Sequence, residues 1–185
     1  LKVAPNLYLN ESYRDSIFEK VKISPISDEK AQYSDLAFLM LQEYIENEYK
    51  ENLDQIVKTN LFNKISVNLT YNPTKFISTK YITPSEIDNY FRNKEIHGYV
   101  HDMAASMMGG IAGHAGLFGS AIEVAKMMQL FIQEGEYGNL KFLNKEIVDL
   151  FNKCHYCEYK NRRGLGFDKP QIEGDGPTCG CLSNK

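Results

Sequence analysis

Apolar residues recur at three- and four-residue steps in several stretches, which is the spacing of amphipathic helices. Thr83-Pro-Ser-Glu86 adds a helix-start signal, with threonine at the N-cap, proline at the first helical position and glutamate two residues later. Shorter helices are predicted over Met103–Met108 and directly after Asn144. The longer predicted helices are Ser12–Lys22, Leu36–Tyr49, Asn52–Leu61 and Ala121–Glu134. Arg162-Arg-Gly-Leu-Gly-Phe167 predicts the start of a sheet strand.

Residues 109–121 hold five glycines and one histidine in thirteen positions, and no charged residue. Such glycine density indicates positive backbone φ angles or backbone that another atom approaches closely. A phosphate-binding loop is not predicted, because neither G-x-G-x-x-G nor a final Gly-Lys-Ser/Thr is present. We therefore expect a tight apolar turn that leads into the helix beginning after Ser120. His114 is interpreted as structural, with a backbone carbonyl as its partner.

The 185 residues are 43% hydrophobic and 24% charged, which is ordinary for a globular domain with a core. The net charge of −3 predicts no nucleic-acid partner. No apolar run approaches the ~20 residues that cross a bilayer, so no membrane segment is predicted. No signal peptide is visible at Leu1.

Four cysteines lie late in the chain, as Cys154-His-Tyr-Cys157 and Cys179-Gly-Cys181, with 21 residues between the pairs. The spacing is near that of a zinc ribbon, but the second pair is C-x-C instead of C-x-x-C. We expect no zinc site, no other metal and no cofactor. Disulfides and free thiols both remain open.

Three histidines invite a catalytic or metal-binding interpretation. His97 and His101 have H-x₃-H spacing, but Gly98 between them argues against the helix that such a site needs. His101, Asp102 and His114 could provide a hydrolytic base, its orienting carboxylate and a second base, but Asp102 directly precedes a predicted helix. We interpret Asp102 as the N-cap of that helix.

Ser27-Asp-Glu-Lys30 matches S-x-x-K, the nucleophile motif of serine β-lactamases. That motif requires a serine at the start of a buried helix. Here the four residues are polar and lie only three residues before the next element, so we reject the match.

Three segments carry a family resemblance: Tyr33-Ser-Asp35 before the 36–49 helix, Val100-His-Asp102, and Gly113-His-Ala-Gly-Leu-Phe118. Together they resemble the serine β-lactamase and penicillin-binding-protein superfamily. The nearest branch is the class C-like serine hydrolases, including those fused to family-three glycoside hydrolases in bacteria. The resemblance covers about Tyr13 to Asp168. It implies an α+β fold, with residues 1–185 as one mainly helical, partial domain that lacks the family's S-x-x-K and H/K-T-G segments.

The resemblance makes Tyr33 the general base and puts Asp35 at the position that contacts the nucleophilic lysine or the substrate. The family usually has asparagine at the Asp35 position. An ionised carboxylate donates no hydrogen bond, so recognition of an amide is in doubt. The residues alone favour a simpler interpretation, in which Ser34 or Asp35 caps the following helix.

The implied function is part of a serine hydrolase that acts through an acyl-enzyme on an ester, an amide or a cell-wall peptide. The isolated chain is expected to be inactive, with the rest of the parent domain as its partner. The parent protein is expected in the periplasm or on the surface of a bacterium. The alternative is a non-catalytic binding or scaffold module, stapled by zinc at the late cysteines.

Overall fold

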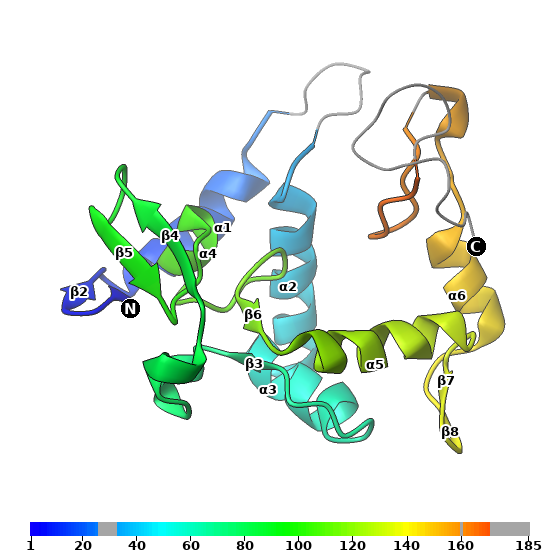
Figure 1. Cartoon of the computed structure of the whole chain (residues 1–185). Helices are drawn as coiled ribbons and strands as arrows, with labels where there is room; N and C mark the ends of the chain where they lie inside the picture. The colour runs from blue at the N-terminus through cyan, green and yellow to red at the C-terminus, as the bar shows by residue number, and fades with distance from the viewer. Residues whose placement is uncertain (26–32, 160, 171–185) are drawn as a thin grey trace. The chain divides into compact units, whose positions relative to one another are not determined.

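The computed structural model describes residues 1–25, 33–159 and 161–170 (Figure 1). The chain forms two compact units. Unit 1 comprises Leu1–Ile26 and Ser34–Val124, and unit 2 comprises Ser27–Tyr33 and Ala125–Lys185. In the described part of the chain, no helix combines the length and the apolar character needed to span a membrane.

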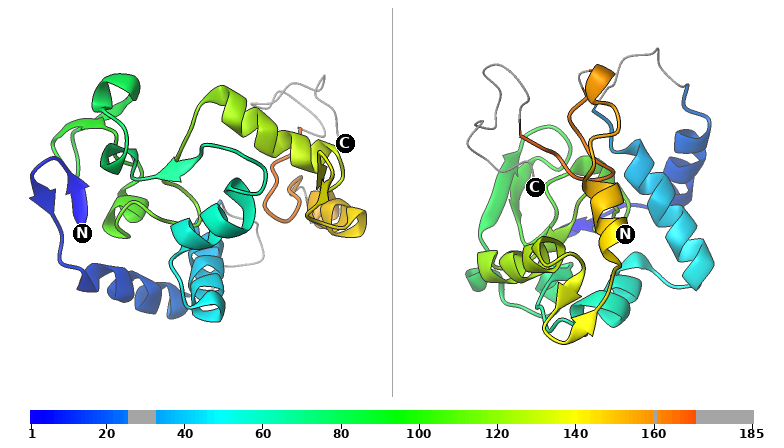
Figure 2. Two further views of the ribbon diagram at one scale, coloured as in Figure 1. Left: turned by 90° about the horizontal axis from the view of Figure 1, so that it is seen from below. Right: turned by 90° about the vertical axis from the view of Figure 1, so that its right-hand side faces the viewer.

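The α-helices of unit 1 each contribute buried side chains. They are α1 (Ser12–Lys22), α2 (Leu36–Tyr49), α3 (Leu53–Val57) and α4 (Met103–Met107), and a π-helical turn over Lys58–Phe62 extends α3. Phe18 of α1, Leu39 of α2 and Met108 after α4 are all buried in one cluster. The segment between α2 and α3 is short, and the two helices lie side by side in both figures (Figures 1 and 2).

The strands of unit 1 form antiparallel pairs. They are β1 (Lys2–Ala4) with β2 (Leu7–Tyr8), β3 (Thr70–Tyr71) with β6 (Leu117–Phe118), and β4 (Pro84–Asp88) with β5 (Lys94–His97). The β4–β5 hairpin pairs Asp88 with Lys94. A second small core of Ala4, Ile96 and Tyr99 joins this hairpin to the N-terminal strands.

Unit 2 contains most of α5 (Ala121–Ile132), the hairpin of β7 (Glu136–Tyr137) and β8 (Leu140–Lys141), and α6 (Lys145–Asn152). Gly135, at φ +95°, ends the α5 segment, as the sequence predicts. An apolar cavity of about 350 Å³ lies between α5 and α6, and Val148 and Phe151 line it. The rings of Phe131 and Phe167 meet there edge to face, with centroids 5.1 Å apart.

The predicted α+β class is confirmed, because helices and small antiparallel sheets coexist. The predicted helices at 12–22, 36–49, 103–108, 121–134 and after Asn144 are present within two residues of their predicted ends. Asp102 is the N-cap of α4, and its carboxylate accepts from the Ala105 N–H.

The helix predicted from Thr83-Pro-Ser-Glu86 is wrong, because Pro84–Asp88 forms strand β4. The segment pairs with β5, whose partner residues lie six to thirteen positions away in the sequence. Asp88 then ends the strand by accepting from the Tyr90 and Phe91 N–H groups. The capping signals are local, and a non-local ladder overrides them.

The strand predicted at Arg162–Phe167 is also wrong. Gly164 N donates to Phe167 O at 2.9 Å, and Leu165 N donates to Phe151 O at 2.8 Å. The segment therefore turns back onto the end of α6. A Cβ at Gly164 would lie 2.3 Å from Phe151 O, so glycine permits this close approach. Among the described residues no strand pairs with the segment.

Candidate functional site

Tyr33 and Asp35, the two residues that the resemblance assigns to a second catalytic motif, precede α2. The Tyr33 side chain is 77% exposed, and the Arg163 guanidinium lies 5.0 Å from its ring centroid, within unit 2. Asp35 is at the N-cap position of α2, but its side chain makes no capping bond. Ser34 Oγ instead accepts from Leu36 N at 3.2 Å. The Asp35 carboxylate is therefore not used to cap the helix.

Within unit 1, Asp35 lies close to two residues that are distant in sequence. One ligand atom from each of Asp35, Asp102 and His114 lies within 4.8 Å of the other two. Asp102 Oδ1 lies 2.9 Å from His114 Nε2 and 2.7 Å from the Ala105 N that donates to it. A carboxylate-paired imidazole beside a second carboxylate can bind a cation or exchange a proton.

His114 differs from the sequence-based interpretation. Its hydrogen-bond partner is the Asp102 carboxylate and not a backbone carbonyl. The His114 side chain is only 4% exposed, and that of Asp102 is 30% exposed. Burial alone would raise the pKa of Asp102, but the bonds from the Ala105 N–H and from His114 outweigh it and hold the pKa below its ordinary value. Asp102 is therefore a carboxylate at neutral pH.

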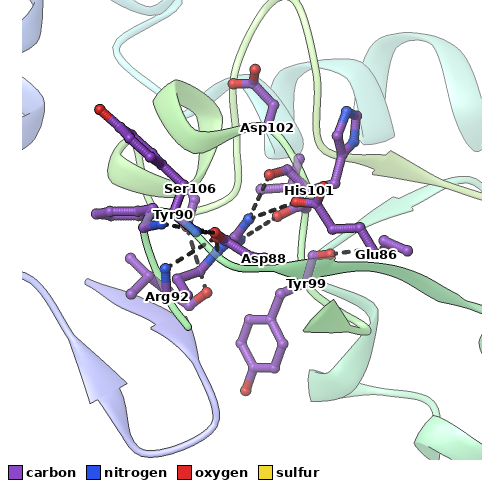
Figure 3. A network of polar contacts seen from close by, with 12 residues as sticks. Glu86, Asp88, Tyr90, Arg92, Tyr99, His101, Asp102 and Ser106 are labelled. Carbon is purple, nitrogen blue, oxygen red and sulfur yellow. Dashed lines mark hydrogen bonds and ion pairs between the residues drawn. The ribbon is translucent and has the colours of Figure 1, made fainter. Parts of the chain in front are cut away.

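The segment that leads into Asp102 is held by a buried arginine, which we call the Arg92 clamp (Figure 3). The Arg92 side chain is 0% exposed. Its Nη1 donates to Val100 O at 2.6 Å, and its Nη2 donates to His101 O. Because both carbonyls immediately precede Asp102, the clamp fixes the chain where the site begins. The Asp102 carboxylate itself points away from the arginine (Figure 3).

Asp88 balances the buried charge of Arg92. Arg92 Nε donates to Asp88 Oδ2 at 2.7 Å, and the Asp88 side chain is 4% exposed. Three backbone N–H groups, from residues 90 to 92, also donate to this carboxylate. The Arg92 guanidinium, followed by these donors, holds the pKa of Asp88 well below its ordinary value.

The turn that carries His114 is held by a neutral side chain, which we call the Gln42 clamp. Gln42 of α2 is 1% exposed. Its Nε2 donates to Ile111 O at 3.1 Å, and its Oε1 accepts from Gly113 N at 3.0 Å. Gln42 Nε2 also lies 3.2 Å from Glu46 Oε1, and Glu46 is ion-paired with Arg14. One amide thus binds a donor and an acceptor of the turn just before His114.

Close backbone contacts at two positions of the turn show why glycine is required there. A Cβ at Gly113 would lie 2.4 Å from Phe38 O of α2. Gly116 has φ +110°, and a Cβ there would lie 2.4 Å from Gly110 O. The turn therefore packs backbone against backbone, as its glycine density predicts.

The other sequence candidates do not join this cluster. His97 Nε2 contacts Ile82 O, and the His101 side chain lines a cavity of about 400 Å³ that His114 also lines. Cys154 and Cys157 form a disulfide with their Cα atoms 5.7 Å apart, which resolves one of the open alternatives. Cys179, Cys181 and Ser27-Asp-Glu-Lys30 lie outside the described residues.

Sequence reasoning missed Arg92 and Gln42. Gln42 lies three residues after Leu39, on the buried side of α2, and a polar residue on an apolar stripe is a usable signal. Arg92 gave no comparable signal, because its partners come from strand β4 and from a loop eight residues later.

No known family profile matches the chain, and no solved structure matches it. The chain is 30% identical, over 201 aligned positions, to an Escherichia coli K12 protein named "Putative D-alanyl-D-alanine carboxypeptidase". The alignment covers 98% of this chain and 45% of that protein. A protein of the same name from Salmonella enteritidis is 31% identical over 92% of this chain and 43% of its own length.

The chain thus spans less than half the length of these curated relatives. The names agree, at a coarse level, with the resemblance to penicillin-binding proteins and hydrolases.

Proposed function

We propose that this chain forms the helical part of a penicillin-binding-protein-like serine hydrolase that acts on cell-wall peptides ending in D-alanyl-D-alanine. The observation that carries the proposal is the similarity over 98% of the chain to the Escherichia coli relative. The second-motif sequence Tyr33-Ser-Asp35 at the start of α2 supports the same class. In this proposal residues 1–185 are one partial domain of an exported bacterial protein.

Tyr33 is the proposed general base. A serine elsewhere in the whole protein attacks the peptide carbonyl, and Tyr33 accepts the serine proton and passes it to the departing D-alanine amine. Water then attacks the acyl-enzyme, its proton leaves through the same phenol, and the serine is restored. The exposure of Tyr33 and the nearby Arg163 guanidinium suit a phenol that must reach a substrate. Tyr71 does not suit this role, because burial raises its pKa to about 12.

Asp35 is proposed to orient the nucleophile's lysine partner. A carboxylate attracts an ammonium group, and the Asp35 side chain is not used in capping α2. That carboxylate lies near Asp102 and His114.

The test uses the whole protein, with a labelled penicillin and a peptide ending in D-alanyl-D-alanine. We expect covalent labelling of a serine outside residues 27–30 and release of D-alanine. Tyr33→Phe should lower kcat by ~10²–10⁴-fold, because it removes the proton acceptor and keeps the ring. The matched control is Tyr90→Phe, a similarly exposed tyrosine at 86% exposure, which should keep full activity.

Full kcat in Tyr33→Phe would remove the support for the second-motif assignment. The isolated chain should hydrolyse neither nitrocefin nor p-nitrophenyl acetate. Turnover by the isolated chain that disappears in Ser27→Ala would instead show that Ser27 is a nucleophile.

A further inference from the structure

We propose that a loop of unit 1, residues 75–81, binds the surface of a membrane that contains anionic lipid. The sequence of this 75–81 loop is Lys75-Phe-Ile-Ser-Thr-Lys-Tyr81, and all seven residues are exposed. The loop has two lysines, three large apolar or aromatic side chains and no acidic residue. It lies at the edge of unit 1 opposite α1 (Figures 1 and 2).

The apolar side chains of the 75–81 loop form a local patch. Phe76 is 72% exposed, Ile77 is 42% exposed and Tyr81 is 74% exposed. Ile77 and Tyr81 border the same cavity of about 600 Å³, so the patch is continuous along the loop. Single exposed apolar residues are ordinary, whereas a cluster of them marks an interaction surface. Burial of such side chains at the boundary of headgroups and acyl chains drives peripheral membrane binding.

The charges of the loop favour an anionic membrane as the partner. Among the described residues neither Lys75 nor Lys80 is ion-paired, and Lys80 Nζ lies 4.6 Å from the centroid of the Tyr81 ring. The carboxylate that borders the cavity, that of Glu123, is only 8% exposed and accepts from Asn68 N. The exposed charges of the loop are therefore all positive. Lysine next to apolar and aromatic side chains suits an interface with negative headgroups.

The backbone of the loop is paired within the loop itself. The N–H groups of Phe76 and Ile77 both donate to Pro73 O, at 2.9 and 2.8 Å. The Tyr81 N–H donates to Ser78 O at 3.0 Å. Unpaired backbone groups are costly where water is scarce, and these short helical turns avoid that cost. The apolar side chains can therefore enter the headgroup region without leaving these donors unpaired.

Both ends of the loop are fixed to the rest of unit 1. Before the loop, Pro73 is buried and Asn72 Nδ2 donates to Gly109 O at 2.9 Å. After the loop, His97 Nε2 contacts Ile82 O. The apolar side chains are therefore held in exposed positions before binding, and a preorganised loop loses little conformational freedom on binding. Membrane binding goes beyond the proposed hydrolase function and does not depend on it.

The test mixes the chain, disulfide intact, with sedimenting vesicles of phosphatidylcholine alone or of phosphatidylcholine and phosphatidylglycerol in equal amounts. We expect the chain to bind the anionic vesicles and to bind little to phosphatidylcholine alone. Binding should weaken between about 0.05 M and about 0.5 M salt, because salt screens exposed charges. Lys75→Gln combined with Lys80→Gln should weaken binding to the anionic vesicles by ~10–30-fold.

A second pair of variants tests the apolar contribution. Phe76→Ser combined with Ile77→Ser should weaken binding at least ~10-fold, because two side chains can no longer be buried in lipid. The matched control is Met40→Ser combined with Leu41→Ser on α2, whose side chains are 52% and 54% exposed. This control should bind as the unmodified chain does. Circular dichroism checks that each variant is folded.

Fluorescence gives an independent measure of insertion, because the chain contains no tryptophan. In Phe76→Trp, the emission should shift to shorter wavelength when anionic vesicles are added. Tyr90→Trp is the control, at an 86% exposed position between β4 and β5, and its emission should not shift.

The proposal is overturned if the folded chain binds no vesicles, if it binds both kinds equally, or if the Phe76 and Ile77 variant binds as well as the α2 control. It is also overturned if the isolated chain binds and the whole protein does not, because another protein surface would then cover the loop. Should the Phe76 and Ile77 variant fail to fold, the lysine variant and the Phe76→Trp emission decide. Failure of membrane binding would leave the labelling and Tyr33→Phe tests of the hydrolase untouched.

Discussion

The Arg92 clamp and the Gln42 clamp perform the same task by different physical means. Each is a buried side chain that binds the backbone just before a residue of the candidate site. The Arg92 clamp is charged and requires Asp88 as its counter-ion. The Gln42 clamp is neutral and acts on a turn in which Gly113 packs directly on α2. The charged clamp is therefore sensitive to loss of a partner and to acid, and the neutral clamp is sensitive to added atoms.

The largest expected effect is that of Arg92→Met. The substitution leaves the Asp88 carboxylate buried without its cation, and the Val100 and His101 carbonyls without donors. Removing one partner of a buried ion pair costs about 3–5 kcal/mol of the free energy of unfolding. Urea denaturation followed by circular dichroism measures the loss.

Two variants control this prediction. Lys20→Met removes an exposed cation of α1 and should change the free energy of unfolding by less than about 0.5 kcal/mol. Arg92→Lys keeps the positive charge but loses the planar set of N–H donors of the guanidinium. Its free energy of unfolding should therefore lie between those of Arg92→Met and Lys20→Met. An Arg92→Met protein as stable as Lys20→Met would show that the buried pair contributes nothing, and the comparison between the clamps would fail.

The sequence predicted the elements of unit 1 better than it predicted its clamps. The helices 12–22 and 36–49 follow from local periodicity, and the Asp102 cap follows from one residue and its neighbours. Strand β4 was mistaken for a helix, because its pairing with β5 is not encoded within four residues. The Arg92 clamp depends on that same pairing. A contact that exists only after a hairpin forms cannot be predicted from the local pattern.

The cluster of Asp35, Asp102 and His114 was missed for the same reason. Asp102 and His114 were considered together with His101 but were then interpreted separately, as a cap and a turn histidine, and Asp35 was not connected with them. Their proximity depends on how the glycine-rich turn packs against α2, and Gln42, 71 residues before Gly113, sets that packing.

The second prediction concerns Gln42→Met, which keeps the length of the side chain and removes its polar atoms. Ile111 O and Gly113 N lose their partner, and leaving buried polar groups unpaired costs about 1–3 kcal/mol. The matched control is Gln129→Met on an exposed position of α5, which should be nearly neutral. Equal urea midpoints for the two variants would show that the turn is held by packing alone.

The third prediction separates hydrogen bonding from packing in the same turn. Gly113→Ala places a Cβ where Phe38 O lies 2.4 Å away, so backbone must move. We expect a loss of about 1–3 kcal/mol, with shifted NMR signals for His114 and Phe38. Gly138→Ala is the control, since its Cβ would meet no atom within 4 Å, although its φ of +60° carries strain. That variant should leave the His114 signals in place.

The last prediction uses pH to distinguish the two clamps. The expected change of stability with pH is absent near neutral pH. Asp88 and Asp102 have pKa values below the ordinary aspartate value of ~3.9, so both stay ionised in the folded chain when the unfolded chain begins to bind protons. The stability that they contribute is therefore complete above about pH 4 and falls as the pH drops through the folded pKa values.

Melting temperatures should be measured from pH 7 to pH 2. The contribution of these two carboxylates to the melting temperature should be constant down to about pH 4 and should then decline. Asp88→Asn, whose side chain cannot ionise, should be less stable at pH 7 and should decline less steeply in acid. The melting temperature of Gln42→Met should instead differ from that of the unmodified chain by the same amount at every pH. An amide does not titrate, so its loss costs the same at pH 7 and pH 3. Gln42→Met and Asp88→Asn could instead change the decline of the melting temperature below pH 4 by the same amount. Stability in acid would then not depend on the Asp88–Arg92 pair, and the difference between a charged and a neutral clamp would have no measurable consequence.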